Sequence, residues 1–129
     1  MDSIYSKHVV LYSLIQTQQT SYSIKKKTYT IDLFITTYNE STELVRRTIL
    51  AFKNLEYPVE ALSIWVCDDG RRLEMKRLAE SLSVGYITRS NNDHAKAGNL
   101  NNALALTKEE LIVTIDADMI PKPNFLKIL

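Results

Sequence analysis

Two aspartates with one residue between them, Asp116 and Asp118, follow the apolar run at residues 110–115. If the extended backbone of a strand continues past this run, both side chains leave on the same side. Two adjacent carboxylates repel each other, and a divalent cation relieves this repulsion. Oxygen ligands favour Mg²⁺ or Mn²⁺ over zinc, and Mg²⁺ is often held by one or two carboxylates together with substrate phosphates. The pair therefore indicates a metal site for a nucleoside diphosphate, although the same short pattern also occurs in ordinary acidic turns.

Polar residues also follow two earlier apolar runs. Asp68 and Asp69 precede Gly70, and their carboxylates could accept hydrogen bonds from a base or a ribose. The same residues could instead form an Asx turn in which the glycine supplies a positive φ. Tyr38, in the segment TTYNE, could stack on a flat base. Glu40 belongs to the same segment and could simply be part of the start of a helix.

The segment HAKAGN, residues 94–99, opens a predicted helix. The first turn of a helix presents free N–H groups and the positive end of the helix dipole, which together suit a phosphate group. Lys96 would add a positive charge at this point. The alternative is a solvated lysine beside a capping asparagine, and His94 is more typical of a loop than of a metal ligand.

The spacing of apolar residues predicts the elements that must position these groups. Strands are expected at residues 29–37, 62–67, 84–88 and 110–115, and helices at 41–55, 71–82 and 97–107, with a further helix beginning at 124. Ser41 is expected to cap the first helix. The alternation predicts an α/β fold with a mainly parallel sheet and helices on both faces. Ligands of such sheets bind beyond the carboxyl ends of the strands, where all four polar groups are expected to meet.

The composition excludes several functional classes. The net charge is +1, from 16 basic and 15 acidic residues, so a nucleic-acid binder with a broad basic face is not expected. The single cysteine, Cys67, cannot form an internal disulfide and lies in an apolar run, which indicates a small buried hydrophobic residue. Only three glycines occur, and neither a G-x-G-x-x-G nor a P-loop motif can be written.

Residues 1–28 differ from the rest because they contain the polar stretch QTQQTSYS and three consecutive lysines. This composition predicts a poorly ordered arm, followed by one partial domain at residues 29–129. The apolar run at residues 9–15 is much shorter than the roughly 20 residues that a membrane span needs. On this ground the chain itself is expected to be cytoplasmic.

The segments TTYNE, DDG, HAKAGNLNNAL and DAD occur in this order, each after a predicted strand. Together they resemble the first half of a family 2 glycosyltransferase domain with the GT-A fold, and they look most like processive cellulose-synthase-like enzymes. The resemblance covers residues 30–129 and implies a Rossmann-like nucleotide-binding half-domain. It also implies inverting transfer from a UDP-sugar, with UDP-glucose as the first expectation, to a growing polysaccharide, assisted by Mg²⁺ or Mn²⁺.

The resemblance implies a set of donor-binding residues, namely Tyr38, Glu40, Asp68, Asp69, Lys96 and Asp116. The first two would lie near the uracil and ribose, the next two would hold the nucleoside, and the lysine would lie near the diphosphate. Asp116 and Asp118 would hold the metal. The family's later acidic motif, its Gln-x-x-Arg-Trp motif and its membrane helices are not found in this sequence. The expectation is therefore a donor-binding half that lacks the catalytic base and is inactive alone, from a synthase at the cytoplasmic face of a membrane.

Two other functions compete with this one. The first is a nucleotide-binding or regulatory module without catalysis. The second is a phosphatase that uses the first aspartate of the D-x-D pair as a nucleophile. That chemistry needs further residues downstream, whereas only 11 residues follow Asp118, and the preceding strand is the fourth predicted strand rather than the first.

Overall fold

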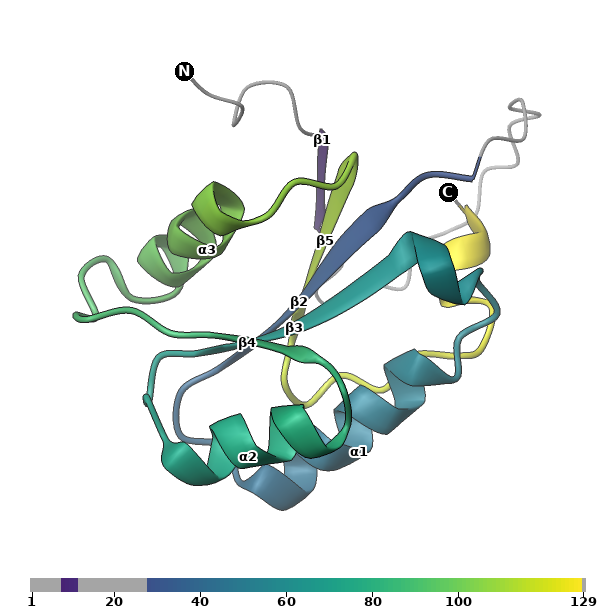
Figure 1. Ribbon diagram of the computed structural model, residues 1–129. Coiled ribbons are helices and arrows are strands. Elements are labelled where there is room, and N and C mark those ends of the chain that lie inside the picture. The colour runs from purple at the N-terminus through teal and green to yellow at the C-terminus, as the bar shows by residue number, and fades with distance from the viewer. Residues whose placement is uncertain (1–7, 12–27, 129) are drawn as a thin grey trace.

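The computed structural model describes residues 8–11 and 28–128, which form a parallel five-stranded sheet flanked by helices (Figure 1). The strands lie in the order β1-β5-β2-β3-β4, and every neighbouring pair is parallel. Their bounds are His8–Leu11 for β1, Ile31–Thr37 for β2, Leu62–Asp68 for β3, Gly85–Ile87 for β4 and Leu111–Asp116 for β5.

The helices cover both faces of the sheet (Figure 1). Helices α1 (Thr42–Lys53) and α2 (Leu73–Ser81) lie on one face, and α3 (Ala95–Leu106) lies on the other. Two short 3-10 helices, η2 (Val59–Ala61) and η3 (Phe125–Ile128), complete the described elements. The α/β fold with a parallel sheet and helices on both faces is confirmed, and the bounds of the predicted strands and of the first three predicted helices agree to within two residues.

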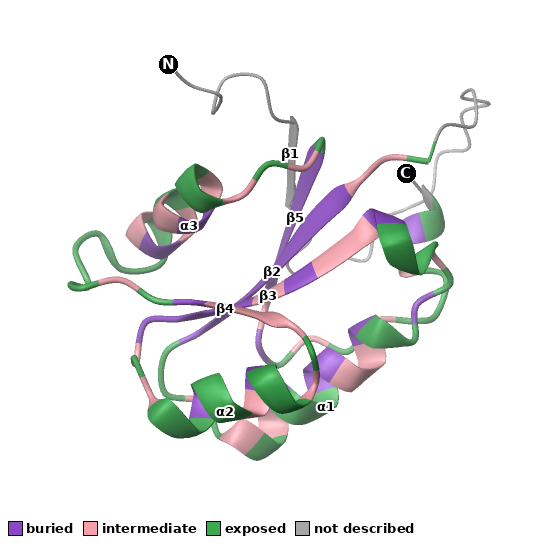
Figure 2. Cartoon of the chain, viewed as in Figure 1, coloured by how far each residue is buried: buried purple, intermediate pink, exposed green. Residues whose placement is uncertain are grey.

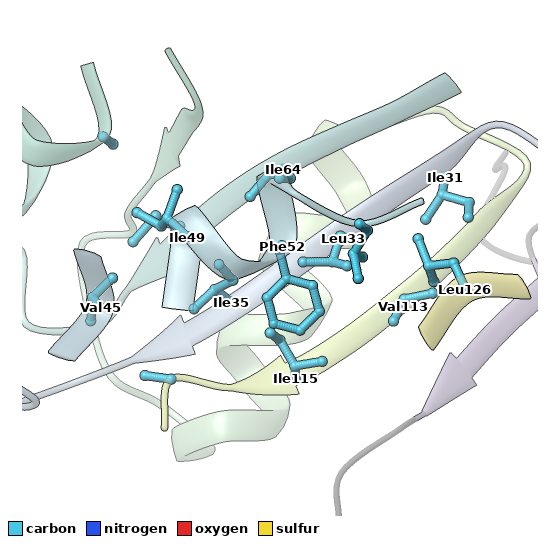
Figure 3. Close-up of a cluster of buried hydrophobic side chains, with 14 of the residues drawn as sticks. Ile31, Leu33, Ile35, Val45, Ile49, Phe52, Ile64, Val113, Ile115 and Leu126 are labelled. Carbon is cyan, nitrogen blue, oxygen red and sulfur yellow. The ribbon is translucent and has the colours of Figure 1, made fainter. Parts of the chain in front are cut away.

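Alternation along the strands divides the core into two clusters. On β2, Ile31, Leu33 and Ile35 belong to the cluster under α1 and α2, whereas Phe34 belongs to the cluster under α3. Successive side chains of a strand point to opposite faces, so a strand that is covered on both faces must be apolar throughout. The central strands β2 and β5 are accordingly buried along almost their whole length (Figure 2). Figure 3 shows the larger cluster, in which the ring of Phe52 lies among aliphatic side chains of the sheet.

Helix α1 begins where the sequence predicts it. The hydroxyl of Ser41 accepts a hydrogen bond of 3.1 Å from the backbone N–H of Leu44, which satisfies one of the free donors of the first turn. Glu43 in the first turn and Lys53 in the last turn both complement the helix dipole. The predicted N-cap is therefore confirmed.

The structure differs from the predicted elements at both ends of the chain. His8–Leu11 form β1, which pairs with β5, so the prediction of a poorly ordered arm does not hold for these four residues. Two of the four residues, Val9 and Val10, are of a β-branched type that favours a strand, and the edge of β5 supplies the partner. Residues 1–7 and 12–27 of the predicted arm lie outside the described residues. The predicted helix from residue 124 is the 3-10 turn η3, which follows two prolines, Pro121 and Pro123.

Membrane-spanning helices are not found in the described part of the chain, because none of its helices is long and apolar enough to cross a bilayer. The thiol of Cys67 is fully buried among apolar side chains, as the sequence indicates, and burial raises its pKa. This thiol is therefore protonated and unreactive at neutral pH.

Candidate functional site

The carboxyl ends of the central strands are aligned by their register. Thr36 on β2 lies opposite Asp116 on β5, and Thr37 on β2 lies opposite Asp68 on β3. A cavity of about 430 Å³ opens beyond these strand ends, between the sheet edge and the start of α3. Six of the seven predicted site residues line it, namely Tyr38, Glu40, Asp69, Lys96, Asp116 and Asp118. The expectation that the polar groups meet at one edge of the sheet is therefore confirmed.

The cavity adjoins a second, more open one of about 740 Å³. Tyr38, Glu40, Asp69 and Asn92 line both cavities. The ring of Tyr38 is well exposed, so one of its faces is accessible to a flat ligand. The two cavities together provide room for an elongated ligand along the strand ends.

Asp116 and Asp118 line the cavity for a different reason from the one that the sequence suggests. The backbone N–H of Met119 donates to the carbonyl of Asp116 at 3.0 Å, so a turn begins where β5 ends. The strand geometry therefore does not continue to Asp118. The turn is fixed from the other side of the sheet, because the hydroxyl of Thr48 on α1 donates to the carbonyl of Ala117. A packed helix thus positions the D-x-D segment.

Lys96 forms an ion pair with Asp116 across the mouth of the cavity. Both side chains are about half exposed, at 51% for the lysine and 43% for the aspartate. The prediction placed Lys96 near a diphosphate and Asp116 on a metal, and the structure brings these two residues into direct contact. The carboxylate of Asp116 therefore already interacts with one cation, whereas Asp118 lies exposed beside it.

The start of α3 has an unusual backbone that Arg89 holds in place. His94 and Ala95 both have positive φ values, 63° and 46°, which are costly for residues other than glycine. The guanidinium of Arg89 donates to the carbonyls of Asp93 and Ala95, each at 2.8 Å. A Cβ atom on Gly98 would lie 2.0 Å from the carbonyl oxygen of Asp93. The glycine of HAKAGN is therefore required because the preceding loop folds back onto the helix.

Asp69 receives two parallel hydrogen bonds from Arg89, both at 2.8 Å. The pair is nearly buried, with side-chain exposures of 7% for Asp69 and 10% for Arg89. The hydrogen bonds from Arg89 hold the pKa of Asp69 below its usual value and outweigh the opposing effect of burial. Arg89 is not among the predicted site residues, and its position directly after the third predicted strand is the only signal of its role in the sequence.

This ion pair predicts a specific dependence of stability on pH. Because the pKa of Asp69 is lower in the folded state, the stabilisation is complete above the unfolded value of about 3.9 and is lost as the pH falls through the folded value. We expect Asp69→Asn to lose less stability than the wild type when the pH is lowered below about 4. Urea unfolding at a series of pH values measures this, with Glu60→Gln on the surface as the control. An unchanged acid slope in Asp69→Asn would show that the pair contributes nothing.

The carboxylate of Glu40 accepts hydrogen bonds from residues of its own loop, which follows β2. Its Oε1 atom accepts hydrogen bonds from the hydroxyl of Thr37 at 2.7 Å and from the backbone N–H of Tyr38 at 3.0 Å. Burial acts to raise the pKa of Glu40, but these hydrogen bonds and the nearby charge of Arg72 lower it overall. Glu40 is therefore ionised at neutral pH and sets the direction in which the exposed Tyr38 projects.

Asp68 is the one predicted site residue that does not line the cavity. Its carboxylate is fully buried and accepts hydrogen bonds from the backbone N–H groups of Gly70 and Arg72 and from the hydroxyl of Tyr86, each at 2.9 Å. The guanidinium of Arg72 adds an ion pair at 3.0 Å. Burial, together with the neighbouring Asp68, raises the pKa of Tyr86 to about 12. Asp68 thus organises the segment DDG from beneath the site.

The Asx turn at Asp68 is confirmed by its hydrogen bond to the N–H of Gly70, but its backbone differs from the predicted one. The residue with positive φ is Arg71, at 50°, and not the glycine. Gly70 is needed for space instead, because a Cβ atom there would lie 2.3 Å from the carbonyl oxygen of Tyr38. The glycine thus allows the β2 and β3 loops to approach each other.

Comparisons with known proteins agree with this geometry. The family model described as Glycosyl transferase family 2 matches residues 32–129. A cellulose synthase catalytic subunit (UDP-forming) of Pseudomonas fluorescens (strain SBW25) is 46% identical over 99 residues, which are 77% of this chain and 13% of that protein. Cellulose synthase 2 of Novacetimonas hansenii is 43% identical over 97 residues, 75% of this chain and 6% of that protein.

A solved structure shares the fold at low sequence identity. The mannosyltransferase PcManGT from Pyrobaculum calidifontis, in complex with GDP-Man and Mn²⁺, superposes with a TM-score of 0.64 at 22% identity. The match covers 81% of this chain and 33% of that one. The described domain therefore corresponds to about a third of that protein and to a much smaller part of the two synthases.

Proposed function

The chain belongs to glycosyltransferase family 2, and from this premise we propose that its domain binds the nucleoside diphosphate of a UDP-sugar through a divalent metal ion. One observation carries the proposal: Lys96, Asp116 and Asp118 gather at the mouth of a cavity beyond the strand ends. A lysine and two carboxylates are the groups that a metal-bound diphosphate requires. The choice of UDP is supported by the name of the Pseudomonas relative, a UDP-forming synthase.

The residues at the mouth of the cavity fit a hard metal ion. Asp116 and Asp118 offer only oxygen atoms, which suits Mg²⁺ or Mn²⁺. Among the described residues no group of three or more potential metal-ligating side chains occurs, so phosphate oxygens would have to complete the ligand set. A bound Mg²⁺ or Mn²⁺ would supply a Lewis acid that neutralises the charge on the departing diphosphate. The structural relative that was solved with Mn²⁺ supports this choice.

The other residues of the cavity would bind and orient the donor. The ammonium group of Lys96 lies next to Asp116 and could pair with a phosphate oxygen once a metal neutralises that carboxylate. Tyr38 would stack on the base, and Glu40 would hold the loop that carries it. Asp69 would contribute to binding of the nucleoside, and its ion pair with Arg89 would fix its position. Asp68 would support the nucleoside-binding loop without touching the donor.

The relatives support a wider proposal about the complete enzyme. Because they are cellulose synthases, we propose UDP-glucose as the donor, a growing polysaccharide as the acceptor, and a position at the cytoplasmic face of a membrane. None of the carboxylates of the cavity is assigned as the base, since Asp69 is paired with Arg89, Glu40 is bonded within its own loop, and the D-x-D pair would hold the metal. The family assignment disfavours the phosphatase alternative, which would have used Asp116 as a nucleophile.

Calorimetric titration of the purified chain tests the donor-binding proposal. We expect UDP to bind in the presence of Mn²⁺ or Mg²⁺, and its affinity to fall by at least about tenfold when EDTA removes the metal, because the two carboxylates would then repel the diphosphate. Titration with inorganic pyrophosphate separates the contribution of the nucleoside from that of the phosphates. Equal UDP affinity with and without metal, or no binding to folded protein, would refute the proposal.

A further inference from the structure

Asn99, on the first turns of α3, carries a buried hydrogen-bonding atom that the protein does not use. The residue is 2% exposed, and its Nδ2 atom donates to the carbonyl of Cys67 at 3.1 Å. Within the described ranges, its Oδ1 atom is the only buried side-chain nitrogen or oxygen that has no hydrogen-bond partner. Buried polar atoms are almost always paired, because leaving one unpaired costs free energy.

The orientation of this amide follows from its neighbour. A backbone carbonyl such as that of Cys67 can only accept, so the nitrogen of Asn99 must face it and the oxygen must face elsewhere. Asn99 also lines the cavity beyond the strand ends. The side chain of Asn99, whose buried oxygen has no hydrogen-bond partner, is thus part of the wall of the proposed donor site.

The position of Asn99 links it to the nucleoside end of the site. Residues three apart lie on the same face of a helix, so Lys96 and Asn99 both face the sheet edge. Lys96 contacts Asp116 at the end of β5, whereas Asn99 contacts Cys67 near the end of β3. The residues after Cys67 lead to Asp69, which lines the same cavity. The helix therefore presents a cation near the D-x-D segment and an acceptor near the segment DDG.

Three of the four carboxylates that line the cavity already interact with the protein itself, and the fourth, Asp118, lies exposed at the D-x-D end. Both oxygens of Asp69 bind Arg89, and Oε1 of Glu40 binds two donors of its own loop. Asp116 is paired with Lys96. A ligand group that needs an acceptor in this part of the cavity would thus meet the oxygen of Asn99 without first breaking an existing interaction.

We propose that Asn99 Oδ1 accepts a hydrogen bond from the nucleoside of the bound donor, either from the N–H of the base or from a hydroxyl of the ribose. The inference rests on the proposed function. It adds a residue that determines specificity, because Asn99 would favour nucleosides that carry a hydrogen-bond donor at this point. A site that contains a buried acceptor discriminates against ligands that lack the matching donor, because the acceptor then stays unpaired.

The test titrates the full chain, in the presence of Mn²⁺, with UDP, CDP, 2′-deoxy-UDP and 3′-deoxy-UDP. CDP lacks the N–H at position 3 of the base, and each deoxynucleotide lacks one hydroxyl. We expect one of the three analogues to bind the wild type about tenfold more weakly than UDP does. In Asn99→Leu we expect this preference to shrink to about twofold or less, because the variant lacks the oxygen that would accept the hydrogen bond from the nucleoside. The analogue that responds identifies whether the base or the ribose supplies the donor.

Asn101→Leu is the matched control, because Asn101 is exposed on the same helix and should keep the wild-type preference. Asn99→Ala provides a second variant in case the leucine disturbs packing, and circular dichroism checks that each variant is folded. Equal affinity of the wild type for all four nucleotides would overturn the inference without reference to any variant. A preference that persists in both Asn99 variants would also overturn it while leaving the proposed function intact. A wild type that binds none of the nucleotides would refute the proposed function, and this inference with it.

Discussion

Asp118→Asn is expected to weaken Mn²⁺-dependent UDP binding by on the order of a hundredfold, because it removes a charged metal ligand while keeping the shape of the side chain. Asp118 is exposed on the turn after β5, so the substitution should change the free energy of unfolding by less than about 0.5 kcal/mol. The combination of lost binding and retained stability would separate a metal ligand from a structural residue. Calorimetry with UDP and Mn²⁺ measures the first quantity, and urea unfolding measures the second.

Asp93→Asn is the appropriate control for this experiment. Asp93 is also exposed, lies in the loop before α3 and loses the same single charge. If general electrostatics governed the binding of the metal, both variants would lose affinity to a similar degree. A loss of less than about threefold in Asp118→Asn would contradict the proposal that this residue holds the metal.

Asp68→Ala is expected to destabilise the fold by about 3–5 kcal/mol, because it leaves Arg72 without its buried partner. The carboxylate is fully buried, accepts two backbone N–H groups and the Tyr86 hydroxyl, and forms the ion pair with Arg72. All of these donors lose their acceptor at once. Urea unfolding measures the change, and Glu80→Ala, an exposed acid on α2, should change the stability far less.

This experiment also distinguishes the two roles considered for Asp68. A residue that mainly contacts the donor would lose UDP affinity with little change in stability. A residue that holds the segment DDG in place would lose stability first and affinity only as a consequence. A destabilisation below about 1 kcal/mol would contradict the structural role, because breaking a buried ion pair costs more than that.

Asp68 and Asp69 show where sequence reasoning reaches its limit. The two residues are adjacent and of the same type, and the family resemblance implies the same role for both. Successive side chains at a strand end point to opposite faces of the sheet, so one carboxylate enters the α2 side and the other enters the α3 side. Asp68 thus meets Arg72 and Tyr86, and Asp69 meets Arg89. The alternation of side chains along a strand predicts that the two carboxylates point to opposite faces. The partners of each carboxylate are known only from the packing of the helices.

The sequence by itself predicted the four strands β2 to β5, the three α-helices and the edge at which the site lies. Short, continuous apolar runs rich in β-branched residues indicate strands that are covered on both faces, and the alternation of strands with helices indicates a parallel sheet, in which the polar strand ends meet at one edge. The order β1-β5-β2-β3-β4, the ion pair between Lys96 and Asp116, and the unpaired oxygen of Asn99 were decided by the tertiary structure. Local sequence pattern fixes which residues are apolar and how they repeat along the chain. These three features depend instead on contacts between residues far apart in the sequence, which only the packing of the whole domain determines.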